Sequence, residues 1–417
     1  MSTGSATGAS QTDVVIIGAG LAGLAAARVV HQAGRSFQII EASDDIGGRV
    51  RTDHVDGFLL DRGFQVLLTA YPEAHRQLDL AALNLQAFDP GALVWRHGRG
   101  HVVGDPFRMP TSLPSTALAP IGSIADKIRI GLQRQRLRRG HASRLLGGQD
   151  TSTIGALRAA GFSDKAIDRF LRPLFAGIQL DPSLTTSRRM YDIIFRSLAD
   201  GNSVVPAGGM QTIPRQMASH IPADAIHLNT SAIAIDGTTV TTNRGATIAA
   251  KAVVIATEGP AAGRLAAIEP VGSRSVGCVY FSADRAPIDR KLVVLDGTSA
   301  GPALNVVVIS NVAPSYAPPG KHLIAAAMPS VVDGDLEHMA RAQLRGWWGD
   351  QVDSWTHLRT YRIAHGQPDQ SPPFNPKQSI SLGEGLFVCG DHRDTGSIQG
   401  AMFSGRRCGQ AVVRATA

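Results

Sequence analysis

The 417-residue sequence predicts an α/β fold with two domains, one of which is assembled from separate parts of the chain. Two observations carry this prediction. A strand-helix-strand pattern with glycines at its first turn occupies residues 13–52, and a glycine-ended strand followed by a helix lies near the C-terminus. Between them, helical spacings alternate with short β-branched runs, which predicts further helices and an antiparallel sheet.

The first pattern predicts a β-α-β unit. Val14–Ile17 is short, β-branched and followed by glycine, as expected for a buried strand. Leu21–Gln32 carries Leu and Ala at helical spacing, and Phe37–Ile40 predicts a second buried strand. A parallel sheet covered by helices is therefore expected at this end of the chain.

Three glycines, Gly18, Gly20 and Gly23, lie at the first strand-to-helix turn. In the dinucleotide-binding fingerprint the first permits the tight turn, the second lets the backbone approach a pyrophosphate, and the third allows close helix packing. The phosphates would lie at the helix N-terminus, where free N–H groups favour anions. Glu41 ends the second strand, where it can accept hydrogen bonds from an adenosine ribose and disfavours NADP by repelling a 2′-phosphate. The sequence thus predicts a Rossmann-like domain.

Composition limits the class of protein. The length suggests two or three domains, and 43% hydrophobic residues with 45 Gly and 23 Pro indicate a globular, loop-rich chain. No apolar stretch approaches the roughly twenty residues that span a bilayer. Residues 1–12 lack signal-peptide features and are expected to form a disordered tail. Three widely spaced cysteines, Cys278, Cys389 and Cys408, favour a reducing, cytoplasmic location and predict neither a disulfide framework nor a metal site.

Positive charge is concentrated in one segment. The net charge is +7 and the isoelectric point about 9.7. The cations of the segment are Lys127, Arg129, Arg134, Arg136, Arg138, Arg139 and Arg144. Ile124, Ile128, Leu132 and Leu137 recur there, which predicts a basic amphipathic helix within 124–144. Its charged face either is simply solvated or makes a peripheral membrane or anionic-substrate contact. No aromatic interleaving accompanies the charge, so no nucleic-acid partner is expected.

The remaining elements are predicted from spacing and turn residues. The predicted helices are Tyr71–Leu83, Ser123–Arg139, Ser152–Ala160, Asp164–Leu174, Thr186–Leu198, Pro206–Ala218, Asp333–Trp348 and 398–413. The predicted strands are His227–Asp236, Thr239–Thr242, Lys251–Thr257, Gly277–Phe281, Leu292–Leu295, Leu304–Ser310, His322–Ala326 and Trp355–Ile363. A glycine-marked turn is expected at Gly57–Gln65 and a proline-rich loop at Gly366–Pro376.

The C-terminal motif begins with the strand Leu386–Cys389, which ends in Gly390 and Asp391. A carboxylate just past a strand end is well placed to bind sugar or ribityl hydroxyls. The helix that starts at Ile398 has small residues, including Ala401, which allow a ring system to approach closely. Its N–H groups and positive end could stabilise negative charge on a reduced flavin.

These motifs resemble the flavin-containing amine oxidase and phytoene desaturase superfamily, which also includes protoporphyrinogen oxidase. The resemblance covers nearly the whole chain and is strongest at 18–23 with Glu41, at 47–49 and at 390–391 with the closing helix. It implies a discontinuous FAD-binding domain of the GR2 type and a mixed α+β substrate domain. The implied FAD-binding parts are 13–90, 201–270 and 376–417, and the implied substrate parts are 91–200 and 271–375.

The resemblance also implies how FAD is bound. The implied cofactor-binding residues are Gly18, Gly20, Leu21, Ala22, Gly23, Glu41, Ala42, Gly48, Arg49, Gly63, Phe64, Ala232, Gly390, Asp391, Ile398 and Ala401. Glu41 would contact the adenosine ribose, Gly48 and Arg49 the diphosphate, and Asp391 the ribityl chain. Gly63 and Phe64 would lie near the flavin, and Ala232 stands where the family has a valine against adenine. Non-covalent FAD is expected, because no cysteine occupies the family's attachment position.

Catalytic residues are left unassigned by the sequence. His392 and Arg393 follow Asp391, and His365 precedes the proline-rich loop, so each could orient substrate or move a proton. The alternative is that each only makes structural hydrogen bonds. Flavin chemistry needs little beyond orientation and electrostatics from the protein, so the lack of an acid/base triad is no objection.

The leading functional hypothesis is an FAD-dependent oxidoreductase that removes a hydride from a C–H bond of an apolar small molecule, as desaturases do. An aromatic content of 5% and the basic helix favour this over a flavin amine oxidase. A non-redox FAD isomerase is a further alternative. An FAD-free lipid- or GTPase-binding protein and an NAD-only dehydrogenase are disfavoured by Glu41 with Gly390 and Asp391. Substrate, electron acceptor and oligomeric state are left open.

Overall fold

A computed structural model describes residues 10–417. Its largest sheet has eight strands, which come from three separate parts of the chain. They are β1 (Ser10–Ile17), β2 (Phe37–Ile40), β10 (Ile226–His227), β11 (Ala232–Asp236), β12 (Thr239–Thr242), β13 (Thr247–Ile255), β19 (Ser381–Gly383) and β20 (Leu386–Val388). The main path runs β10-β2-β1-β13-β12-β11, and β20 pairs with both β13 and β19. Neighbouring strands along β10-β2-β1-β13 are parallel, and so is the β13–β20 pair. β12 pairs antiparallel with both β13 and β11, and β19 pairs antiparallel with β20.

Register brings four strand ends to one edge of this sheet. Ile17 is paired with both Ile40 and Ile255, and Ile255 is paired with Val388. The turns after β1, β2, β13 and β20 therefore open side by side, at the carboxyl ends where open α/β sheets bind ligands. The sequence motifs ending these strands are thus adjacent, although the first and the last strand end, Ile17 and Val388, are 371 residues apart in the chain.

A second sheet has seven strands in the order β18-β14-β17-β16-β15-β7-β8. They are β7 (Gly91–Arg96), β8 (Arg99–Gly104), β14 (Ser273–Ala283), β15 (Val293–Asp296), β16 (Asn305–Val308), β17 (His322–Pro329) and β18 (Thr356–Pro368). Only the β15–β7 pair is parallel. Smaller sheets pair β3 (Thr52–Val55) with β4 (Phe58–Asp61), and β9 (Ser203–Pro206) with β5 (Leu67–Leu68) and β6 (Leu85–Ala87).

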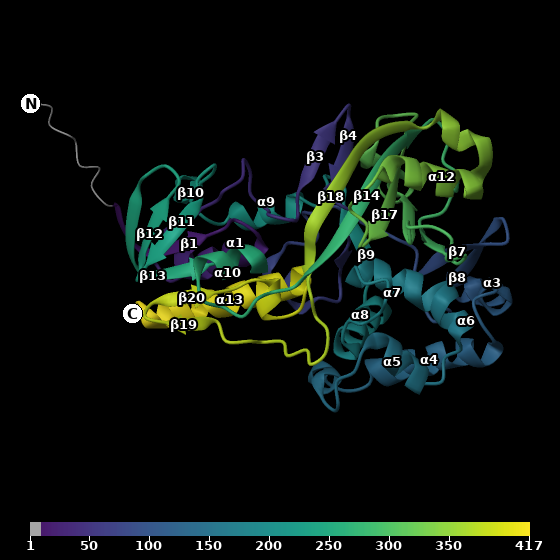
Figure 1. Cartoon of the computed structure of the whole chain (residues 1–417), viewed down its shortest axis with the longest axis horizontal. Helices are drawn as coiled ribbons and strands as arrows, with labels where there is room; N and C mark the ends of the chain where they lie inside the picture. Colours follow the sequence, from purple (N-terminus) through teal and green to yellow (C-terminus); the bar gives the residue numbers. More distant parts are fainter. Residues whose placement is uncertain (1–9) are drawn as a thin grey trace, which may run out of the picture.

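Helices cover both sheets. Their bounds are α1 (Leu21–Gln32), α2 (Pro72–Gln77), α3 (Leu113–Leu118), α4 (Ile124–Arg138), α5 (Thr153–Ala159), α6 (Asp164–Ala166), α7 (Arg172–Gln179), α8 (Arg188–Asp200), α9 (Thr212–Ala218), α10 (Gly259–Leu265), α11 (Ile309–Val312), α12 (Leu336–Trp348) and α13 (Ile398–Ala415). Figure 1 shows the eight-stranded sheet with α1, α10 and α13 at one end of the molecule, and the seven-stranded sheet with the α3–α8 helices at the other.

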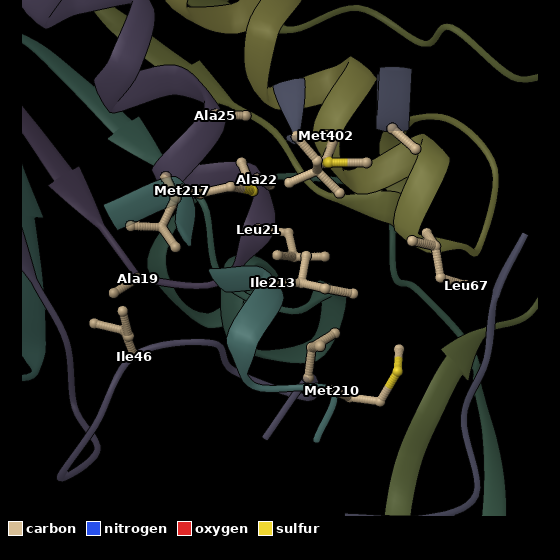
Figure 2. Packing of buried hydrophobic residues seen from close by; sticks show 14 of the residues in the cluster. Ala19, Leu21, Ala22, Ala25, Ile46, Leu67, Met210, Ile213, Met217 and Met402 are labelled. Atoms are coloured by element: carbon tan, nitrogen blue, oxygen red, sulfur yellow. The ribbon is translucent and has the colours of Figure 1, made fainter. Parts of the chain in front are cut away.

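The first and last helices pack unusually closely. A Cβ atom on Gly405 of α13 would lie 2.1 Å from the Ala22 carbonyl oxygen of α1, and one on Gly409 would lie 2.8 Å from that of Ala26. Only glycine fits at such contacts. Figure 2 shows the core below them, where side chains of α1, α9 and α13, including Ala22, Met217 and Met402, meet.

The predicted α/β class with a Rossmann-like sheet is confirmed, and several element bounds are corrected. Ser10–Thr12, predicted as tail, continue β1 because they pair with Ile248–Ala250; residues 1–9 of that prediction lie outside the described residues. The helix predicted at Tyr71–Leu83 ends at Gln77, because Leu78 adopts an extended conformation. The helix predicted from Pro206 begins only at Thr212, since Pro206 ends β9.

Each of the two predicted domains supplies the strands of one large sheet. The three predicted FAD-binding segments supply the eight-stranded sheet, and the two predicted substrate segments supply the seven-stranded sheet. The domain boundaries themselves remain a prediction.

Candidate functional site

One cavity of about 1540 Å³ extends from the glycine-rich turn to the α3–α8 helices. This exceeds the roughly 300–1,000 Å³ that holds a single drug-sized ligand. The predicted cofactor residues that line it are Gly18, Gly20, Leu21, Ala22, Glu41, Ala42, Gly48, Arg49, Gly63, Phe64, Ala232, Gly390, Asp391, Ile398 and Ala401. Gly23 is the one predicted residue that does not line the cavity. The cavity groups these residues, and their contact with the cofactor remains a prediction.

The three fingerprint glycines have different surroundings. Gly18 has a φ of +108°, which disfavours other residues, and a Cβ there would lie 3.0 Å from the Ala256 carbonyl oxygen. A Cβ on Gly20 would have no atom within 4 Å, so it would project into open space beside the cavity. A Cβ on Gly23 would lie 1.9 Å from the Gly18 carbonyl oxygen. Gly20 therefore leaves room for a pyrophosphate, whereas Gly23 lets α1 begin against the turn.

Glu41 is held firmly at the end of β2. Its Oε2 accepts a hydrogen bond from the Ala19 N–H at 2.7 Å. Its Oε1 accepts from the Ser43 N–H at 2.9 Å and the Ser43 hydroxyl at 2.7 Å. A carboxylate has about four acceptor positions, so one remains for a ribose hydroxyl. Sequence reasoning missed Ala19 and Ser43, because neither belongs to the glycine pattern.

Arg49 and Asp391 form a bidentate ion pair. Arg49 Nη2 donates to Asp391 Oδ1 at 2.7 Å and Nη1 to Oδ2 at 2.9 Å. Nη1 also donates to the Gly366 carbonyl at 3.0 Å. Burial raises the pKa of Asp391, but the charge and hydrogen bonds of Arg49 outweigh it, so the net pKa is lowered. Two residues expected at neighbouring parts of FAD thus also orient each other, a contact that sequence reasoning missed.

The turn that presents Gly63 and Phe64 is fixed by a buried carboxyl group. Asp61 Oδ1 accepts from the Thr52 hydroxyl at 2.6 Å and the Met210 N–H at 2.9 Å, and Oδ2 accepts from the Tyr316 hydroxyl at 2.9 Å. Burial raises the pKa of Asp61 to about 6, although these hydrogen bonds oppose the shift. The end of β4 is therefore tied to the segment just before α9, through Met210, and to the Tyr316 segment.

The three residues weighed for catalysis do not line the cavity. Burial lowers the pKa of His392 to about 4, so its ring is neutral near neutral pH. The pKa of His365 is lowered first by burial and then by the charge of Arg49, and its Nδ1 lies 2.5 Å from the Ser273 hydroxyl oxygen. Arg393 donates to the Ser379 carbonyl at 3.1 Å. None of the three thus reaches the cavity, whereas the neighbouring Gly366 and Gln367 do.

The far part of the cavity is walled mainly by apolar side chains. They include Ile121, Phe170, Leu174, Ile178, Ile194, Phe195 and Leu198, which come from the α3–α4 connection and the α7 and α8 region. Nearer the cofactor residues, the rings of Phe64 and Phe88 lie 6.2 Å apart at 58°. The far part of the cavity, among α4, α7 and α8, is suited to an apolar molecule.

Within residues 10–417 the structure has neither a metal-binding cluster nor a membrane-spanning helix. Over 10–417, no group of three or more His, Cys, Asp or Glu is placed to hold a metal ion. Within the same range, no helix is long and apolar enough to cross a membrane. The three cysteines are all buried.

Comparisons with known proteins place these features in a family. Coproporphyrinogen III oxidase of Propionibacterium freudenreichii subsp. freudenreichii is 31% identical over 213 residues, which is 47% of this chain and 39% of that protein. Chloroplastic protoporphyrinogen oxidase of Nicotiana tabacum is 25% identical over 47% of this chain and 34% of that protein. The matched part is thus less than half the length of these relatives.

Solved structures share the whole fold. Cyclohexylamine oxidase from Brevibacterium oxydans superposes with a TM-score of 0.71 and 16% identity, covering 97% of this chain and 99% of that one. At that identity the likeness shows the fold alone.

The family model described as flavin-containing amine oxidoreductase matches residues 21–413. The match includes the whole seven-stranded sheet, the larger sheet apart from β1, and every C-terminal motif of the cavity. It confirms the predicted family, its assignment to the oxidoreductases and the predicted FAD cofactor. The glycine cradle and the anchored Glu41 fit that cofactor. The chain belongs to the flavin-containing amine oxidoreductase family.

Proposed function

We propose that this protein is an FAD-dependent oxidoreductase that removes a hydride from a C–H bond of an apolar organic substrate, giving a C=C or C=N product. The observation that carries the proposal is the single cavity. It joins the cofactor motifs at the carboxyl ends of β1, β2 and β20 to an apolar chamber among α4, α7 and α8.

Bound FAD would supply the two-electron acceptor for the hydride. The chain's own residues bind and orient. The glycine turn and the N-terminus of α1 would receive the diphosphate, Glu41 the adenosine ribose, and the Arg49–Asp391 pair the central part of the cofactor. The apolar walls at Phe170, Leu174 and Ile194 would hold the substrate and exclude water. We also propose that FAD is held without a covalent bond.

Amine oxidation is the second candidate. It is favoured by the Phe64–Phe88 pair beside the predicted flavin position and by the likeness to an enzyme named for cyclohexylamine. We prefer an apolar substrate because the far wall is largely apolar and the cavity is large. The relative named for coproporphyrinogen III indicates that family members also act on large ring systems.

The remaining alternatives differ in what they need from FAD. A binding protein without FAD is disfavoured, because the family is flavin-containing. A non-redox isomerase would need reduced FAD and consume no electron acceptor.

The test is anaerobic mixing of the FAD-loaded protein with three probes, namely coproporphyrinogen III, cyclohexylamine and detergent-dispersed phytoene. Bleaching of the flavin absorbance by phytoene or coproporphyrinogen, faster than by cyclohexylamine, is the expected result. Bleaching by the amine alone would establish the second candidate. Conversion of a probe only after pre-reduction, with no acceptor consumed, would establish an isomerase. Flavin that stays with acid-precipitated protein would contradict non-covalent binding.

A further inference from the structure

Exposed apolar side chains are concentrated in one short stretch. Within residues 10–417, seven large hydrophobic side chains are exposed, and six of them lie between Phe107 and Leu132. These six are Phe107, Leu113, Leu118, Ile124, Ile128 and Leu132, and we call them the 107–132 patch. Leu118 is 84% and Ile124 is 74% exposed. Single exposed apolar residues are normal, but a cluster indicates an interaction surface.

The orientation of α4 makes this exposure a fixed feature. Ile124, Ile128 and Leu132 are spaced four residues apart and share the exposed face, whereas Asp126 and Arg134 are buried on the opposite face. Asp126 accepts from the Ser123 and Ser163 hydroxyls, each at 2.7 Å. Arg134 Nε donates to Asp105 at 2.9 Å. These polar contacts lock the helix with its apolar face outward, the reverse of the usual arrangement.

The patch also borders the proposed substrate entrance. Five of its six residues, all except Leu132, line the same cavity as the glycine-rich turn. In Figure 1, α4 belongs to the group of helices at the end of the molecule away from the eight-stranded sheet. The outer part of the cavity is therefore formed by side chains that also project to the surface.

Along the chain segment that carries the patch, cations greatly outnumber carboxylates. Between residues 107 and 149 the chain has eight Lys and Arg residues but one acidic residue, Asp126, which is buried. Arg136, Arg139 and Arg144 are exposed and form no ion pair among the described residues. Two copies joined by a two-fold axis would bring this charge against itself. An anionic lipid surface would complement it, with apolar residues reaching the acyl boundary.

We propose that the 107–132 patch docks this protein on an anionic lipid bilayer, and that apolar substrate passes from the bilayer into the cavity between α3 and α4. The proposed docking is supported by the exposed apolar patch and the positive charge of its segment, independently of the proposed function. The passage of substrate rests on the proposed function. The basic amphipathic segment predicted from the sequence thus acts through its exposed apolar face as well as its cations.

The experiment is vesicle flotation of the FAD-loaded full chain, with phosphatidylglycerol-containing vesicles compared with pure phosphatidylcholine. The variants are the triple exchange Ile124→Ser, Ile128→Ser, Leu132→Ser and the pair Arg136→Gln, Arg139→Gln. Ile233→Ser is the matched control, because Ile233 is 61% exposed but lies on β11 outside the patch. Far-ultraviolet circular dichroism verifies that each variant is folded.

Wild type and Ile233→Ser are expected to float with anionic vesicles, and the triple variant to bind at least about tenfold more weakly. The double variant Arg136→Gln, Arg139→Gln should bind the vesicles more weakly than wild type, and its binding should depend less on salt concentration. Equal flotation of wild type and the triple variant, or none by wild type, would overturn the docking. So would a wild-type dimer in light scattering that the triple variant dissociates. Flotation without flavin bleaching by any apolar probe would refute the proposed function while leaving the docking intact.

Discussion

Alanine at Gly20 and alanine at Gly23 should separate cofactor binding from folding. Both changes add one methyl group, and the two residues are three positions apart in the same turn. At Gly20 the methyl group meets no atom within 4 Å, and its backbone (φ −73°, ψ 177°) suits alanine. At Gly23 the methyl group would lie 1.9 Å from a backbone oxygen, where contacts below 3.0 Å are essentially never found.

The expected magnitudes follow from these contacts. In Gly23→Ala, α1 or the turn must move by about 1 Å, and overpacking of this kind costs roughly 1–3 kcal/mol or more. Alanine's higher helix propensity offsets about 1 kcal/mol of that cost. In Gly20→Ala, the FAD-free protein should keep its stability within about 0.5 kcal/mol. Its FAD dissociation constant should rise at least tenfold, about 1.4 kcal/mol, because the methyl group takes the place predicted for the pyrophosphate.

Two measurements check this. Urea unfolding of the FAD-free proteins gives stability, and quenching of flavin fluorescence on titration gives FAD affinity. Gly34→Ala is a comparison at a positive φ of +69° with no atom within 4 Å, remote from the predicted pyrophosphate site. It should lose stability through backbone strain but keep its FAD affinity. If Gly20→Ala destabilises the FAD-free protein and leaves FAD affinity unchanged, the reasoning about the two glycines is refuted.

Three further predictions concern buried carboxyl groups. Glu41→Gln should raise the FAD dissociation constant about 10- to 100-fold, because charge-assisted hydrogen bonds are lost, and the same fluorescence titration checks it. Asp391→Asn should lower the free energy of unfolding by roughly 1–3 kcal/mol, since it leaves the partly buried Arg49 unpaired. Because the folded pKa of Asp391 is lowered, wild type should lose this contribution as the pH falls below about 4, and urea unfolding at several pH values should show a smaller difference there. For Asp61 the dependence of stability on pH has the opposite sign. Its folded pKa is raised to about 6, so ionisation of this carboxyl group lowers the free energy of unfolding as the pH rises. Asp61→Asn should therefore gain up to about 3 kcal/mol relative to wild type between about pH 4 and pH 7, and an unchanged difference would contradict this.

The features that could be predicted from the sequence are those that depend on short residue patterns. The glycine turn, Glu41 and the strand ending at Gly390 were recognisable, because each requires particular residues at fixed spacing. Fifteen of the sixteen predicted cofactor residues surround one cavity, and Gly23 has the packing role expected of it.

What escaped prediction depends on tertiary contacts. Arg49 and Asp391 are 342 residues apart, and no spacing rule links them. His392 and Arg393 follow a cavity residue directly, yet both are buried and neither lines the cavity. The direction of the apolar face of α4 is set by Asp126 and its serine partners, so periodicity alone could not decide it.

The glycine contacts between α1 and α13 have a consequence for how the chain is made. Helix α1 ends at Gln32, and its partner helix α13 begins only at Ile398, so the partner is synthesised much later. At about 5–20 residues per second, translation takes roughly 20–80 s. Over that interval the side of α1 that packs against Gly405 and Gly409 lacks its partner. Chains cut before residue 398 would leave the Ala22 and Ala26 side of α1 without this cover.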